Sequence, residues 1–140
     1  MSKVAIVYWS GTGNTEAMAD LIAQGVRASG GTAELLHASS FDPQSIEDYD
    51  AIALGCPAMG DEELEDMEFL PMYDQVEPLL AGRKVVLFGS YEWNDGEWME
   101  LWEKRAEEAG VDVTDSVVAY DYPDEDASAE CLRVGGLLVS

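Results

Sequence analysis

Strand-length runs of apolar residues alternate along this chain with longer segments that have the apolar spacing of helices. This alternation predicts a doubly wound α/β fold, in which each strand of a parallel sheet leads into a helix that returns to the next strand. The predicted strands cover residues 4–9, 33–36, 51–54, 85–88 and 113–119. The predicted helices cover residues 14–29, about 64–80, 96–109 and 127–138, and a short helical turn is expected near residues 43–48.

The first, third and fourth predicted strands are almost continuously apolar, which is typical of a parallel sheet covered by helices on both faces. We expect one domain over residues 1–140, with five strands in the order 2-1-3-4-5, because right-handed crossovers allow that order. Gly30, Gly82 and Gly110 stand where helices are expected to end. Ligands of such sheets bind at the carboxyl ends of strands, so the loops after residues 9, 55 and 89 form the candidate site.

The chain is strongly acidic, with 29 Asp and Glu residues against 7 Lys and Arg residues and a formal net charge of −22. Nucleic acids and anionic membranes are poor partners for such a surface, whereas proteins with basic patches are good ones. The first residues hold only a strand's length of apolar residues before a glycine-rich turn, so we expect no signal peptide, no membrane span and a cytoplasmic protein. Cys56 and Cys131 lack metal-ligand or CxxC spacing and His37 is the only histidine, so we expect two buried thiols and no metal site.

The loop after the first predicted strand has the composition of a phosphate-binding loop. It reads Ser10, Gly11, Thr12, Gly13, Asn14 and Thr15. N–H groups at a helix N-terminus attract phosphate, and hydroxyl and amide side chains donate further hydrogen bonds. The loop lacks the lysine of ATP- and GTP-binding loops, and Glu16 stands where a dinucleotide fingerprint requires glycine. ATP, GTP and NAD are therefore disfavoured; the alternative for this loop alone is a capped turn without a ligand.

Two further loops offer surfaces for a flat aromatic ligand. The loop after the third predicted strand contains Pro57, Ala58, Met59, Gly60, Asp61 and Glu62, and the loop after the fourth contains Ser90, Tyr91, Glu92, Trp93 and Asn94. A methionine beside a glycine gives a soft apolar surface next to a backbone that turns over easily. Two aromatic side chains in a polar, turn-rich segment favour stacking on a planar ring. An ordinary βα loop is the alternative for residues 57–62.

Together the three loops resemble those of the flavodoxin family, and specifically its short-chain members. The segments SGTGNT at 10–15, MGDE at 59–62 and GSYEWNDGEWM at 89–99 match in order, spacing and position after strands, and the similarity covers essentially the whole chain. The resemblance implies noncovalently bound FMN and a low-potential carrier of single electrons between redox proteins, which is not an enzyme. It also implies a monomer whose redox partners carry basic docking patches.

The resemblance implies particular roles for residues of these loops. Residues 10–15 would hold the FMN phosphate without a counter-charge. Trp93 would stack on the outer face of the flavin ring, and Met59 would lie against the inner side. The Gly60 carbonyl would meet the flavin N5–H after reduction, through a peptide turn that only glycine makes without a steric cost.

Both later loops would also meet the edge of the flavin ring. By the same resemblance Glu62 would accept from the flavin N3–H, and backbone N–H groups near Glu92 and Asn94 would meet the N1/O2 edge. Two residues depart from the family pattern: many relatives have a hydroxyl residue in place of Pro57, and Glu92 replaces a small residue. The second departure puts a carboxylate close to the ring.

Other functions of the same fold require different residues at the ends of the strands. A response regulator needs an Asp at the end of the third strand, where this chain has Gly55 and Cys56, and a low-molecular-weight tyrosine phosphatase needs a cysteine after the first strand. An FMN-dependent quinone reductase-like enzyme is the alternative function. Such enzymes usually build a substrate pocket from extra segments, for which 140 residues leave little room.

Overall fold

The computed structural model describes residues 2–11, 13–59, 64–92 and 96–139. Five parallel strands pair in the order β2-β1-β3-β4-β5, which confirms the predicted order. The strands are β1 (Lys3–Tyr8), β2 (Thr32–His37), β3 (Ala51–Gly55), β4 (Lys84–Tyr91) and β5 (Val113–Tyr120). The helices are α1 (Asn14–Ala28), α2 (Phe69–Val76), α3 (Glu97–Glu108) and α4 (Glu125–Leu137), with the short 3-10 turns η1 (Ala38–Ser40), η2 (Pro43–Asp48) and η3 (Glu77–Leu79).

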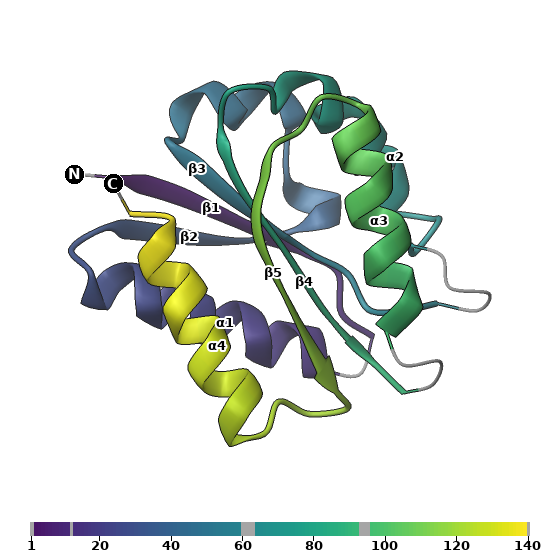
Figure 1. Ribbon diagram of the computed structural model, residues 1–140. Coiled ribbons are helices and arrows are strands. Elements are labelled where there is room, and N and C mark those ends of the chain that lie inside the picture. The colour runs from purple at the N-terminus through teal and green to yellow at the C-terminus, as the bar shows by residue number, and fades with distance from the viewer. Residues whose placement is uncertain (1, 12, 60–63, 93–95, 140) are drawn as a thin grey trace.

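The helices cover the sheet on both faces, α1 and α4 on one and α2 and α3 on the other (Figure 1). Successive residues of β1 alternate between the two apolar layers. Val4 and Ile6 belong to the cluster under α1 and α4, and Ala5 and Val7 to the cluster under α2 and α3. All four are fully buried. The near-continuous apolar sequence of the central strands follows from this double cover.

Helices α1 and α4 touch through their backbones. A Cβ atom on Gly25 would overlap the carbonyl oxygen of Leu132, and one on Gly135 would overlap the carbonyl oxygen of Ile22. Only glycine permits this approach at either position. Gly136, the next residue of α4, has more room, because the nearest atom to a Cβ there is the Ser29 hydroxyl oxygen at 3.1 Å.

The predicted helix over residues 64–80 is wrong in its first part, because α2 begins only at Phe69. The reason is the carboxylate of Glu65, which is 5% exposed. It accepts hydrogen bonds of 2.7–2.8 Å from three backbone N–H groups, those of Met67, Glu68 and Phe69. A local side-chain acceptor thus holds these N–H groups in a turn before the helix starts.

The ends of the other elements lie close to the predicted positions. Left-handed Gly30 and Gly110 end α1 and α3 as predicted, with φ of 91° and 86°. Gly82, with φ of 80°, is left-handed too but lies in the turn between η3 and β4. Strand β4 runs further than predicted, so Ser90 and Tyr91 are strand residues that pair with β5. Among the described residues, no helix is long and apolar enough to cross a bilayer.

Candidate functional site

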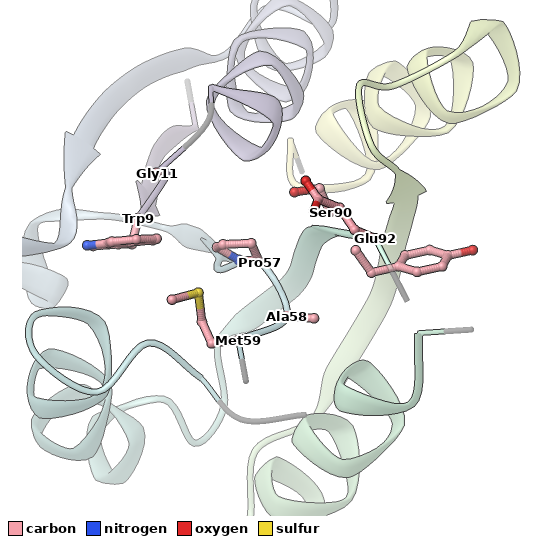
Figure 2. A pocket seen from close by; sticks show the side chains of 8 residues that line it. Trp9, Gly11, Pro57, Ala58, Met59, Ser90 and Glu92 are labelled. Atoms are coloured by element: carbon pink, nitrogen blue, oxygen red, sulfur yellow. The ribbon is translucent and has the colours of Figure 1, made fainter. Parts of the chain in front are cut away.

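A pocket of about 190 Å³ lies at the carboxyl ends of β1, β3 and β4. Its lining comes from all three predicted loops and consists of Trp9, Gly11, Pro57, Ala58, Met59, Ser90, Tyr91 and Glu92. Figure 2 shows Trp9 and Met59 at one end of this lining and Ser90 and Glu92 at the other. The sheet order brings these loops together, because β1 and β3 are neighbours and the chain winds in opposite directions from them.

The loop after β1 enters helix α1 through a hydroxyl-rich turn. The Ser10 hydroxyl accepts hydrogen bonds from the backbone N–H of Gly13, at 3.0 Å, and of Glu16, at 3.3 Å. Gly13 has a φ of 94°, which turns the chain into the first residue of α1. The Thr15 and Ser90 hydroxyls are 2.9 Å apart and buried, so they tie α1 to β4. This arrangement presents a helix N-terminus and neutral donors to an anion.

The loop after β3 is fixed against β4 by its own backbone. Cys56 N–H donates to the Phe88 carbonyl at 3.1 Å, and Ala58 N–H donates to the Ser90 carbonyl at 3.0 Å. The Trp98 indole N–H donates to the Cys56 carbonyl at 3.2 Å, so the donor of this buried side chain is satisfied. A Cβ on Gly89 would overlap that carbonyl oxygen, so the approach of β4 to this loop requires glycine.

Trp9 is a pocket residue that the sequence analysis did not assign to the site. It follows β1 directly, and its indole lines the pocket while its N–H donates to the Glu68 carboxylate at 3.0 Å. The predicted first strand ended at Trp9, so Trp9 was assigned to the strand and not to the loop that forms the site. A large aromatic side chain directly before a glycine-rich loop at a strand's carboxyl end was the available signal.

The residues predicted for the site and present in the described part of the chain gather at one edge of the sheet. Seven of them line the pocket, namely Gly11, Pro57, Ala58, Met59, Ser90, Tyr91 and Glu92, and four form the neighbouring turn and first residues of α1, namely Ser10, Gly13, Asn14 and Thr15. Thr12, Gly60, Asp61, Glu62, Trp93 and Asn94 lie outside the described residues. Their predicted roles stay predictions.

Tyr91 connects the pocket to two other aromatic rings. Its ring centroid lies 5.7 Å from that of Trp98 and 5.5 Å from that of Tyr120. The turn-rich sequence around Tyr91 predicts a polar loop, whereas in the structure Tyr91 is half-buried at the end of β4. Tyr91 therefore packs on the core with one side and faces the pocket with another.

Charge is divided unevenly between the two edges of the sheet. All seven cationic side chains stand at the start of a strand or in the second half of a helix, and none lines the pocket: Lys3, Arg27, Arg83, Lys84, Lys104, Arg105 and Arg133. The described charged residues that follow the carboxyl ends of strands are all acidic: Glu16, Glu65, Asp66, Glu68, Glu92, Glu97, Asp121, Asp124, Glu125 and Asp126. The pocket therefore opens on an acidic edge.

The described residues offer neither an exposed thiol nor a metal-binding group. Cys56 and Cys131 are both free and buried, which confirms the prediction of two buried thiols. Burial raises the pKa of each thiol to about 12. No group of three or more His, Cys, Asp and Glu side chains suited to a metal ion occurs within the described part of the chain.

An open parallel sheet with a hydroxyl-lined helix N-terminus and an apolar-walled pocket at its switch point defines a doubly wound nucleotide-binding protein. The flavodoxin family model matches residues 6–135 of this chain. The flavodoxin of Megasphaera elsdenii is 46% identical over 132 residues, which cover 94% of this chain and 95% of that protein. The flavodoxin of Clostridium beijerinckii is 44% identical over 131 residues, which cover 93% and 94%.

A solved structure agrees with these relatives. The solution structure of two-electron reduced Megasphaera elsdenii flavodoxin superposes with a TM-score of 0.89 at 44% identity, and the match covers 96% of this chain and 97% of that one. The chain belongs to the flavodoxin family. It binds FMN and carries electrons, and it is not an enzyme, so the quinone reductase-like alternative is set aside.

The described residues suit FMN by their chemistry. The turn at Ser10 and the start of α1 offer neutral donors of the kind that a phosphomonoester accepts. Trp9, Pro57 and Met59 supply the flat and soft apolar surface that an aromatic ring system needs. Both parts lie at the same edge of the sheet, so one elongated ligand can reach them together.

Proposed function

We propose that this protein is a low-potential carrier of single electrons between redox proteins, with its FMN in the pocket between β1, β3 and β4. It works as a monomer in the cytoplasm. The observation that carries the proposal is the character of the pocket edge, which combines apolar walls, neutral donors and carboxylates without a Lys or Arg in the lining.

Different parts of this edge bind the phosphate and the ring of FMN. The loop of residues 10–15 and the first turn of α1 hold the phosphate through N–H and hydroxyl donors. Trp9, Pro57 and Met59 form an apolar wall for the flavin ring and exclude water from it. Bound FMN supplies the redox chemistry, and the protein supplies binding, orientation and electrostatics.

The acidic edge has two consequences for electron transfer. Negative charge near the flavin disfavours an added electron and so lowers the reduction potential. Glu92 is the carboxylate in the pocket lining, and the family resemblance implies a small residue at this place. The same charges attract basic patches on redox proteins, which raises the rate of productive encounters.

Three measurements on the purified holoprotein test the proposal. Released cofactor identified by mass, followed by anaerobic potentiometry, should give FMN and a second one-electron potential below that of free FMN. Electron transfer to cytochrome c, a basic haem protein used here as a probe, should slow as salt rises, because screening removes the attraction. FAD, or a second potential no lower than that of free FMN, would contradict the low-potential carrier; a rate indifferent to salt would contradict the electrostatic docking.

A further inference from the structure

Trp9 is held from two sides. On one side its six-membered ring lies against Gly11 of the phosphate loop, where a Cβ atom would stand 3.1 Å from Cη2 and 3.3 Å from Cζ3. On the other side its indole N–H donates to Glu68 Oε1 at 3.0 Å. The indole thus connects the loop after β1 to Glu68 in the turn before α2, 59 residues away in sequence, and it also lines the pocket.

Glu68 does not reach Trp9 from a loose segment. Its backbone N–H donates to the buried Glu65 carboxylate at 2.7 Å. The neighbouring N–H groups of Met67 and Phe69 donate to the same carboxylate. The Glu65 N–H in turn donates to Cys56 Sγ at 3.3 Å, and Cys56 begins the loop that carries Pro57 and Met59. A chain of hydrogen bonds therefore connects Glu68 to the loop that carries Pro57 and Met59.

We propose that Glu68 is a positioning residue for FMN binding: its carboxylate holds the Trp9 indole in the pocket wall, against Gly11 of the phosphate loop. The proposal rests on the placement of FMN in this pocket. Neither residue was part of the site predicted from sequence, and the pair is evident only from the contact between the two segments. A hydrogen bond to a charged acceptor is stronger than one between neutral groups, so this exposed bond favours one orientation of the half-buried indole.

If Glu68 acted only through its charge, removing the carboxylate would change FMN affinity in the opposite direction from the change expected if it positions Trp9. This difference makes the proposal testable. FMN carries an anionic phosphate, so a carboxylate that acted only through its charge would weaken binding, and its removal would tighten binding. A carboxylate that positions Trp9 does the reverse, since its removal frees the indole. Asp66 is the matched control, because it is an exposed carboxylate of the same turn whose side chain makes no hydrogen bond within the described residues.

The experiment measures FMN binding to apo-protein by quenching of flavin fluorescence. Glu68→Leu should weaken binding about tenfold, as expected for the loss of one charge-assisted hydrogen bond. Glu68→Gln keeps an oxygen acceptor and should bind FMN as tightly as the parent or more tightly. Asp66→Leu should also bind as tightly or more tightly. The indole N–H resonance of Trp9 should move in Glu68→Leu and stay close to its place in Asp66→Leu.

A double-mutant cycle separates the bond from other effects. Trp9→Phe keeps a ring in the wall but removes the donor, so Glu68→Leu should cost little more in that background. Full additivity of the two changes, or tighter FMN binding by Glu68→Leu, would overturn the role of Glu68. The placement of FMN is tested separately by Trp9→Ala, which should weaken binding; unchanged affinity in that variant would overturn the placement itself.

Discussion

Glu92, directly after β4, puts a carboxylate in the pocket lining. A charge about 10 Å from a redox centre, in an effective dielectric constant of about 40, shifts a one-electron potential by roughly 35 mV. Glu92→Gln should therefore raise the more negative of the two one-electron potentials by a few tens of millivolts. Asp112→Asn, at the amino end of β5, is the control and should shift it far less. Equal shifts in both variants would remove the special role of Glu92.

The two thiols give a second prediction about single residues. Only the thiolate is nucleophilic, and a pKa raised to about 12 leaves about one thiolate in ten thousand at pH 8. In the native protein neither Cys56 nor Cys131 should react with a chromogenic disulfide reagent at pH 8 over minutes. Both should react at once in concentrated urea. Rapid labelling of one thiol under native conditions would show that its surroundings open more readily than its burial indicates.

At the scale of elements, the crossing of α1 and α4 predicts unequal effects for two adjacent glycines. Gly135→Ala must push the helices apart and should cost about 1–3 kcal/mol in the free energy of unfolding. Gly136→Ala meets only a hydroxyl and should gain up to about 1 kcal/mol of helix propensity. Thermal unfolding of the two variants checks this. A similar melting temperature for both would mean that the crossing adjusts without cost.

The elements also show where sequence patterns suffice. Periodicity predicted the strands and helices and glycine positions predicted the left-handed turns after them, because both depend on local sequence. The strand order, which the structure confirms, was expected from the rules for crossovers and switch points. The first part of the helix predicted over residues 64–80 could not be found this way. Glu65 looks like an ordinary helical residue in sequence, and its three hydrogen bonds depend on its burial behind Cys56. The role of Trp9 could not be predicted for a related reason, because its hydrogen-bond partner Glu68 lies on a different segment of the chain.

For the whole molecule, net charge predicts how salt affects FMN binding. A chain of formal charge −22 repels the FMN phosphate, and no Lys or Arg lines the pocket to form an ion pair that salt would weaken. The Debye length falls from about 30 Å at 0.01 M salt to about 8 Å at 0.15 M. The dissociation constant of FMN should therefore fall over this range. Riboflavin, which lacks the phosphate, is the control and should respond less; weaker FMN binding with salt would indicate a cationic phosphate site.

The uneven division of charge between the two edges of the sheet gives the molecule an electric dipole. The negative end is the pocket edge, and the seven cations lie toward the other end of the strands. A dipole in the field of a positively charged protein experiences a torque that turns its negative end toward the source. A redox partner with a basic patch, as proposed above, would therefore turn the molecule pocket-first while it is still diffusing. The fraction of collisions that arrive in this orientation would then exceed that of a sphere with the same net charge spread evenly.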